Sequence, residues 1–322
     1  MDPFVSIVTP VYNGESYIEE CIKSVLSQNY SNWEYIIVNN KSEDGTLAIA
    51  QKYAALDSRI KVISNKYLLP VMENFNNSIR KISPKSTYCK IICADDWIYP
   101  EFLTQTVELA EQNPNVGIVS SYWLVGGKVL PEGMPYRQKI FSGCEMSRMN
   151  LLKRPYTFGT PSVLLYRSEL VLSKDRFFGE ERTSGDTEAC YEVLKDWDFA
   201  FVPQLLSFQR QHKKTVTSSA ESRGDHVLNP LYAQKIYGES LFDKSEAECR
   251  EKELLSLYYK FLGTHPGRLK DKQFVNYHIK SLEKIGLDFN WKKVLWYFFL
   301  EGTKYVLLKF PRKILRSAVI AV

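Results

Sequence analysis

Short apolar runs alternate with longer amphipathic stretches along the first hundred residues. The runs are rich in branched residues and too short for helices, which predicts strands buried on both faces, at 4–9, 35–38, 61–64 and up to Asp95. Apolar residues at helical spacing predict helices between them, at 17–26, 46–56 and 71–82. This repeated order of strand and helix is typical of an α/β fold with a mostly parallel central sheet and right-handed crossovers.

Polar loops follow three of the predicted strands, at 10–14, 39–46 and 93–97. In a parallel sheet the carboxyl ends of the strands meet at one edge, and ligands bind beyond that edge. We therefore expect the three loops to surround one cleft.

Asp95 and Asp96 stand side by side where the last of these apolar runs ends. Adjacent like charges are costly unless a cation neutralises them, and a hard divalent ion prefers oxygen ligands. An alternative is that one of the two carboxylates caps a helix from Pro100 to Glu111, because Asp ahead of a Pro-Glu pair favours a helix start. The sequence contains neither Gly-x-Gly-x-x-Gly after the first strand nor Gly-Lys-Ser/Thr. Phosphates would then be held through the carboxylates and a divalent ion.

Three stretches resemble, in order and spacing, the motifs of glycosyltransferase family 2, at 5–13, 36–46 and 94–100. The resemblance covers roughly residues 4–215 and implies a GT-A fold. It implies a catalytic domain at 1–222, with a nucleotide-sugar half at about 1–100 and an acceptor half at 101–222. The implied reaction is inverting transfer of a sugar from a nucleoside diphosphate, with uridine diphosphate as the expected carrier.

The resemblance also implies how the donor is held. The first loop would wall the nucleotide base with Pro10, Val11 and Tyr12, and Asn39 would hydrogen-bond the uracil ring. The family usually has Asp at position 39. Asn39 keeps a carbonyl acceptor for a ring N–H but loses the charge.

The same resemblance assigns the paired carboxylates. Asp95 would contact the ribose or the metal, and Asp96 would ligate Mg²⁺ or Mn²⁺ on the diphosphate. Many family members carry a third acid two residues before Asp95, where this sequence has Cys93. The loss of one carboxylate predicts weaker metal binding.

In the acceptor half, residues 128–154 show neither a helical nor a strand periodicity, and we expect them to form an insertion over the cleft. Asp186 and Glu188 begin a predicted helix, where acids are favoured by the helix dipole alone. The resemblance, however, implies a general base at such a helix start, where the family has Glu or Asp followed by Asp. Gly185 holds the first place here, so Asp186 is the candidate base, ahead of Glu188.

Arg210 and His212 follow a predicted strand at 198–202 and point to the same side if the chain is extended. They resemble an Arg-x-His pair of the family. The Arg would bind the diphosphate of the nucleotide sugar, and His212 would act as a donor or a metal ligand. A solvated basic edge strand is the alternative.

The C-terminal region, 223–322, is helical by pattern and basic. It has 18 lysines and arginines against 11 acids, a net charge of +7, whereas residues 1–222 carry −2. Residues 291–322 combine seven basic residues and one acid with aromatic and aliphatic residues, which is typical of a helix in a membrane interface. The alternative is a helical pair that packs on the catalytic domain or on a second subunit of a homo-oligomer. No stretch resembles a base-reading module, so nucleic acid is not an expected partner.

The six cysteines show no Cys-x-x-Cys pair, which predicts free thiols in a reducing compartment and no zinc site. The chain opens on a strand pattern rather than a leader, and no window reaches the ~18 apolar residues of a spanning helix. We expect a cytoplasmic protein, at the inner face of the cell membrane if its acceptor is lipid-linked.

The sequence thus predicts a metal-dependent hexosyl- or N-acetylhexosaminyltransferase of cell-surface polysaccharide synthesis. Its substrates would be a nucleotide sugar and a glycan or lipid-linked acceptor. The alternative is a non-catalytic nucleotide- or carbohydrate-binding protein of the same fold. The case for it rests on Asn39, Cys93 and Gly185, which stand where relatives often carry acids.

Overall fold

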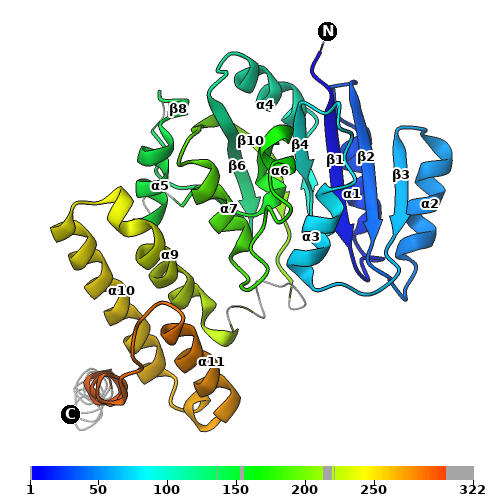
Figure 1. The fold of residues 1–322 in the computed structure, drawn as a ribbon. Helices are drawn as coiled ribbons and strands as arrows, with labels where there is room; N and C mark the ends of the chain where they lie inside the picture. The colour runs from blue at the N-terminus through cyan, green and yellow to red at the C-terminus, as the bar shows by residue number, and fades with distance from the viewer. Residues whose placement is uncertain (1, 136, 153–155, 213–219, 221, 302–322) are drawn as a thin grey trace, which may run out of the picture. The chain divides into compact units, whose positions relative to one another are not determined.

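The computed structural model describes residues 2–301 except 136, 153–155, 213–219 and 221. The chain divides into two compact units, 1–215 and 216–322, whereas the sequence analysis places the boundary at 222. The first unit holds a central sheet, and the described part of the second is helical (Figure 1).

The sheet has ten strands in the order β3-β2-β1-β4-β9-β6-β10-β5, with β7 paired to β6 and β8 to β10. The strands are β1 (Val5–Val11), β2 (Trp33–Asn39), β3 (Ile60–Ser64), β4 (Tyr88–Ile91), β5 (Trp97–Ile98), β6 (Val116–Val125), β7 (Lys128–Leu130), β8 (Ile140–Phe141), β9 (Leu164–Arg167) and β10 (Asp198–Gln209). Strands β1 to β4 are parallel and lie side by side in Figure 1, as β6 and β10 are parallel to each other. β9 runs antiparallel between β4 and β6. The predicted α/β fold with a mostly parallel sheet is confirmed.

Helices cover the sheet. They are α1 (Ile18–Leu26), α2 (Thr46–Leu56), α3 (Val71–Ile79), α4 (Phe102–Glu111), α5 (Gly143–Leu151), α6 (Ser168–Leu172) and α7 (Gly185–Val193), with the 3-10 helix η1 (Pro161–Val163). Val5, Ile7 and Val11 of β1 join residues of α1, α2 and α4 in one apolar cluster. Ser6 and Val8 on the other face of β1 are also buried. Burial on both faces explains why these strands read as continuous apolar runs.

The segment 128–154 is more ordered than its sequence predicts, because it contains β7, β8 and α5. The Ser142 hydroxyl caps α5 by accepting the backbone N–H of Glu145 at 3.1 Å. This Ser-x-x-Glu spacing is a helix-start signal that a search for apolar periodicity overlooks. That this segment is an insertion over the cleft stays a prediction.

The second unit contains α9 (Asp225–Leu241), α10 (Lys244–Thr264), the 3-10 helix η2 (Arg268–Lys270) and α11 (Lys272–Glu283), and residues 291–301 are also helical. Its helices share a separate apolar core that includes Leu231, Tyr258 and Leu282. A helical C-terminal region is thus confirmed. Among the described residues, none of the helices combines the length and apolarity needed to cross a membrane. The rest of the predicted interfacial tail, 302–322, lies outside the described residues.

Candidate active site

The loops that follow β1 and β2 are joined by hydrogen bonds. The Asn13 backbone N–H donates to the Ser42 hydroxyl at 3.0 Å, and the Gly14 N–H donates to the Thr46 hydroxyl at 2.8 Å. A Cβ atom at position 14 would lie 3.5 Å from the Cβ atom of Ala94, in the loop after β4. The three loops therefore contact one another at the carboxyl edge of the sheet, as the strand order led us to expect.

Asn39 is buried at the end of β2, and both ends of its amide are engaged. Its Oδ1 accepts the Ser42 backbone N–H at 3.1 Å, and its Nδ2 donates to the Ser64 hydroxyl at 3.3 Å. These contacts fix the amide orientation with the oxygen toward the loop. A carbonyl oxygen has a second lone pair, so Asn39 keeps the capacity to accept one more N–H.

The three residues predicted to contact the nucleotide base differ in how exposed their side chains are. Pro10 and Val11 are buried within β1, and the Val11 side chain belongs to the apolar core. The Tyr12 ring is half exposed beyond the strand end. Among the three, Tyr12 has the most accessible side chain, and its role in base binding stays a prediction.

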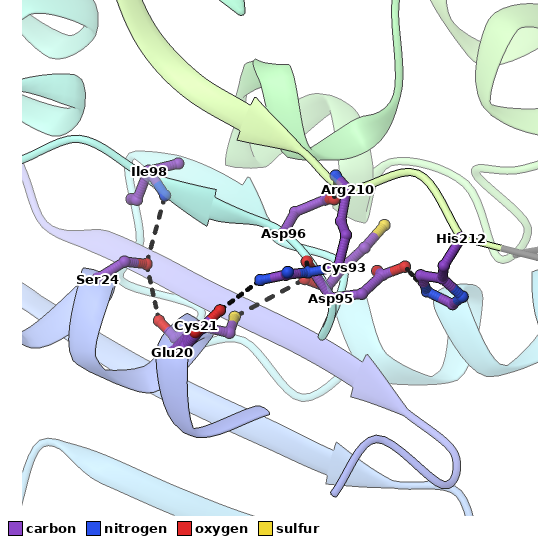
Figure 2. Close-up of polar contacts among 9 residues, drawn as sticks. All are labelled: Glu20, Cys21, Ser24, Cys93, Asp95, Asp96, Ile98, Arg210 and His212. Atoms are coloured by element: carbon purple, nitrogen blue, oxygen red, sulfur yellow. Dashed lines mark hydrogen bonds and ion pairs between the residues drawn. The ribbon is translucent and has the colours of Figure 1, made fainter. Parts of the chain in front are cut away.

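Cys93, Asp95 and Asp96 form one cluster in which the candidate ligand atoms all lie within 4.8 Å of one another. Asp96 is buried, and its Oδ1 accepts the Arg210 backbone N–H at 2.9 Å (Figure 2). Burial and, next, the charge of Asp95 raise the pKa of Asp96 to about 7. Holding two carboxylates close together is unfavourable because their charges repel, and a bound divalent cation would relieve this repulsion. Carboxylate oxygens are suitable ligands for Mg²⁺ or Mn²⁺.

Neither carboxylate caps the following helix. α4 begins at Phe102, its N-cap position is Glu101, and no side chain accepts a capping hydrogen bond there. The short strand β5 separates Asp96 from that helix. The cap alternative is therefore wrong, and both carboxylates remain available to a ligand.

Cys93 stands where many family members have a third acid, and its sulfur is one of the candidate ligand atoms of the cluster. Burial and the charges of Asp96 and Asp95 raise the pKa of the Cys93 thiol well above its ordinary value. The group is therefore a neutral thiol at neutral pH in this setting. A thiol is a softer ligand than a carboxylate, so the oxygens of Asp95 and Asp96 are the better partners for Mg²⁺.

His212 lies against Asp95, with its Nε2 3.0 Å from the Asp95 Oδ2 (Figure 2). The His212 ring stacks on Tyr17 of the loop before α1, with ring centroids 5.0 Å apart. The fold thus brings His212 to the carboxylate with which it was predicted to share a metal. Its side chain is only partly exposed, which argues against a solvated edge strand.

Arg210 also reaches the cluster. Its Nε donates to the Asp95 backbone carbonyl at 3.1 Å, and its guanidinium forms an ion pair with Glu20 of α1 (Figure 2). Glu20 is an acidic residue in the first turn of α1. No local pattern signals this role, because the two residues meet only after folding. Arg210 would have to exchange part of these contacts to bind a diphosphate.

A buried lysine contributes to the hydrogen bonds that hold the loop after β4. Lys90 of β4 has no exposed surface, and its Nζ donates to the backbone carbonyls of Ser162 and Leu164. The Ser162 hydroxyl in turn accepts the backbone N–H of Cys93 at 2.9 Å. The start of β9 and the loop after β4 are thereby fixed to each other. In the sequence, Lys90 is one polar residue within an apolar run, and no local pattern predicts this role.

Asp186 lies in the first turn of α7. Its Oδ1 accepts the Thr187 backbone N–H at 2.7 Å, and burial raises its pKa to about 6. Asp186 is also close enough to Cys93 for its charge to add to the rise in the pKa of that thiol, after burial and the two aspartates. The fold therefore brings the candidate base into the neighbourhood of the metal-type cluster.

Gly185 is required by packing. A Cβ atom at position 185 would lie 2.1 Å from the carbonyl oxygen of Gly179. The segment that carries Gly179 is held in turn by Asn76 of α3, whose side chain exchanges two hydrogen bonds with the backbone of Phe178, at 2.8 and 2.9 Å. The absence of an acid at 185 therefore has a steric cause in this fold.

Glu188, the second candidate base, is already engaged. It accepts hydrogen bonds from the Arg182 guanidinium at both carboxylate oxygens and from the Ser184 hydroxyl at 2.8 Å. Glu188 would have to give up one of these hydrogen bonds before it could accept the proton of an acceptor hydroxyl. The contacts favour Asp186 over Glu188 as the general base.

The sequence model described as Glycosyl transferase family 2 matches residues 6–172, just over half of the chain. The chain belongs to glycosyltransferase family 2. The Escherichia coli family relative WfgD, named as a UDP-Glc:α-D-GlcNAc-diphosphoundecaprenol β-1,3-glucosyltransferase, is 29% identical over 168 residues, which are 49% of this chain and 64% of WfgD. The match to the first curated relatives, from Haemophilus influenzae and Bacillus subtilis, spans only 32% to 49% of their own length.

Two solved structures share the GT-A fold. Residues 1–349 of Staphylococcus aureus TarS, in complex with UDP-GlcNAc, superpose with a TM-score of 0.65 at 19% identity, over 88% of this chain and 80% of that one. The Pyrobaculum calidifontis mannosyltransferase PcManGT, in complex with GDP-Man and Mn²⁺, gives a TM-score of 0.56 at 14% identity, over 96% and 88%. At these identities the likeness establishes the fold.

Proposed function

We propose that the chain is a metal-dependent inverting glycosyltransferase that moves a sugar from a nucleoside diphosphate, with uridine diphosphate as the expected carrier, to a glycan or lipid-linked acceptor in cell-surface polysaccharide synthesis. One observation carries the proposal. The carboxylates Asp95 and Asp96 form one cluster with Cys93 after β4, and the separate carboxylate Asp186 is close enough to Cys93 for its charge to raise the pKa of that thiol.

The paired carboxylates would hold the divalent ion that binds the diphosphate of the nucleotide sugar. Asp95 and Asp96 offer hard oxygen ligands, and His212 on Asp95 keeps that side chain in place. A divalent ion bound there supplies neutralisation of the diphosphate leaving group. Tyr12 and Asn39 would contact the base, and Arg210 would contact the diphosphate.

Asp186 would act on the acceptor. It takes the proton of the acceptor hydroxyl while the hydroxyl oxygen bonds to the anomeric carbon and the bond from that carbon to the diphosphate breaks. Direct displacement of this kind inverts the anomeric configuration. With a pKa of about 6, Asp186 is mostly ionised at neutral pH and still basic enough to share a proton.

The relatives support this assignment without fixing the substrates. TarS binds UDP-GlcNAc, PcManGT binds GDP-Man with Mn²⁺, and WfgD is named for a diphosphoundecaprenol acceptor. These ligands and substrates are those of the three relatives. For this chain they favour a nucleotide sugar as donor, a divalent ion at the carboxylates and a lipid-linked acceptor as the first substrates to test.

The non-catalytic alternative loses part of its support. Gly185 is explained by the carbonyl of Gly179, Asn39 retains an oxygen acceptor, and Cys93 leaves two carboxylates in the cluster. None of the three departures removes a group that the proposed reaction requires. We therefore keep catalysis as the proposed function.

The full chain should be incubated with a panel of nucleotide sugars and Mn²⁺, with released nucleoside diphosphate measured as donor hydrolysis and as transfer to acceptor. We expect turnover with at least one donor and its loss in Asp96→Ala. Calorimetry with UDP and Mn²⁺ is the companion measurement, and Asp96→Ala should also abolish metal-dependent UDP binding. Tight binding without turnover for every donor and acceptor would favour the non-catalytic alternative.

A further inference from the structure

The helix at 291–301 has two apolar faces. On one face Val294 is buried and Tyr297 packs against the core of the second unit. The Tyr297 hydroxyl is 2.6 Å from the Ser256 hydroxyl of α10, and a Cβ atom at position 263 would lie 2.8 Å from the Phe298 backbone nitrogen. These contacts fix which face of the helix points to its own core.

The other face is exposed and aromatic. Its side chains are Trp291, Leu295, Trp296 and Phe299, with exposed fractions of 47%, 53%, 65% and 64%. At about 100° per residue, these four lie within roughly 140° of arc, opposite Val294 and Tyr297. A helix needs one apolar face to pack on its own core, so the second face calls for another partner.

Positive charge accompanies this face. Lys292 is exposed and lies within the arc of this face, whereas the Lys293 ammonium group lies over the Tyr259 ring, 5.3 Å from its centroid. The sequence of 302–322 adds five Lys+Arg and no acid. The second unit as a whole is basic, with +7 over 223–322. A second copy of this unit would meet like charge, and lysine is depleted from protein interfaces. An anionic lipid surface offers both the opposite charge and an apolar layer.

We propose that the exposed face of the helix at 291–301, defined by Trp291, Leu295, Trp296 and Phe299, docks on the surface of an anionic membrane. The helix would lie in the plane of the interface, with its indole rings at the headgroup level and Lys292 on lipid phosphates. The surface follows from the second unit alone. Only its purpose, to bring the first unit to a lipid-linked acceptor, rests on the proposed function.

The test uses the full chain and sedimentation with vesicles of phosphatidylcholine alone or mixed with phosphatidylglycerol. We expect binding to the mixed vesicles, and a loss of at least about tenfold in affinity for the triple variant Leu295→Ser, Trp296→Ser and Phe299→Ser. The matched control replaces Ile236 and Leu257 by Ser. These two are exposed to similar extents, 46% and 48%, on α9 and α10. The control should bind as the parent does.

Circular dichroism and the melting temperature should show that the triple variant is folded, since its changes lie on the surface. A further variant, Lys292→Glu, should weaken the preference for anionic vesicles. Equal vesicle binding by the parent and the triple variant overturns the proposal, as does a parent that binds neither vesicle. A parent that forms a dimer lost only in the triple variant, without vesicle binding, assigns the face to a second copy instead.

Donor hydrolysis separates this proposal from the proposed function. None of the substituted residues belongs to the candidate active site, so the triple variant should keep the parent's hydrolysis rate. Failed vesicle binding with intact hydrolysis would overturn the docking surface only. Absent hydrolysis with intact vesicle binding would overturn the proposed function only.

Discussion

Replacing Asp186 by Asn tests the chemistry most directly. The change keeps the size of the side chain and its contact with the Thr187 N–H, and removes the proton acceptor. General base catalysis typically contributes about 10² to 10⁴ in rate. We therefore expect kcat to fall by about that factor, equivalent to roughly 3–5 kcal/mol in the barrier. Binding of UDP with Mn²⁺ should be unchanged, because Asp186 is not a member of the donor cluster.

The pH dependence supplies a second readout. Burial raises the pKa of Asp186 to about 6, and the deprotonated form is the active one. The fraction ionised is roughly 90% at pH 7 and about 10% at pH 5. At saturating Mn²⁺, which keeps Asp96 ionised, the kcat/KM of the parent should thus be flat above pH 7 and fall about tenfold per unit well below pH 6. Rates at pH 5 to 8, measured as released nucleoside diphosphate at saturating Mn²⁺, give this profile.

The matched control is Glu188→Gln, two residues away. Glu188 is bonded to Arg182 and Ser184, so its loss should lower the melting temperature while the acid limb near pH 6 remains. The assignment is refuted if Asp186→Asn retains more than about a tenth of the parent rate, or if its profile keeps the same acid limb. A loss in Glu188→Gln that exceeds the loss in Asp186→Asn would move the base to Glu188.

Three further outcomes are expected. Gly185→Ala should lower the melting temperature and kcat together, at a cost of about 1–3 kcal/mol, because its Cβ would lie 2.1 Å from the Gly179 carbonyl; unchanged values contradict this. Cys93→Asp should lower the melting temperature without metal and tighten Mn²⁺ binding in calorimetry, since it adds a third carboxylate; weaker Mn²⁺ binding contradicts it. Burial lowers the pKa of His278 to about 4, so the stability that neutral His278 contributes is full above pH 6.5 and is lost as the pH falls toward 4. The free energy of unfolding in urea should fall more between pH 7 and pH 5 in the parent than in His278→Phe, by up to about 2 kcal/mol, and equal slopes contradict this.

Local sequence patterns were sufficient to predict the order of strands and helices in the first unit. The alternation of short apolar runs and amphipathic stretches gave the strand and helix order, because burial on one face or two acts on residues close in sequence. The same holds for the loops at 10–14, 39–46 and 93–97, whose place at one edge follows from parallel strands alone. Asp95 and Asp96 could be singled out for the same reason, since the two charges are neighbours in the chain.

Only the tertiary structure decided how the site is completed. Glu20, Arg210 and Asp95 meet because β10 pairs with β5 and so carries its end to the loop after β4. In the sequence, Gly185 stands where relatives often carry an acid, and only the fold shows that the Gly179 carbonyl leaves no room for a side chain there. Such contacts join residues far apart in sequence and depend on strand register and close packing, for which a single chain carries no local signal. Which carboxylates are engaged by other side chains, and which can bind a ligand, therefore depends on the neighbours that folding brings together.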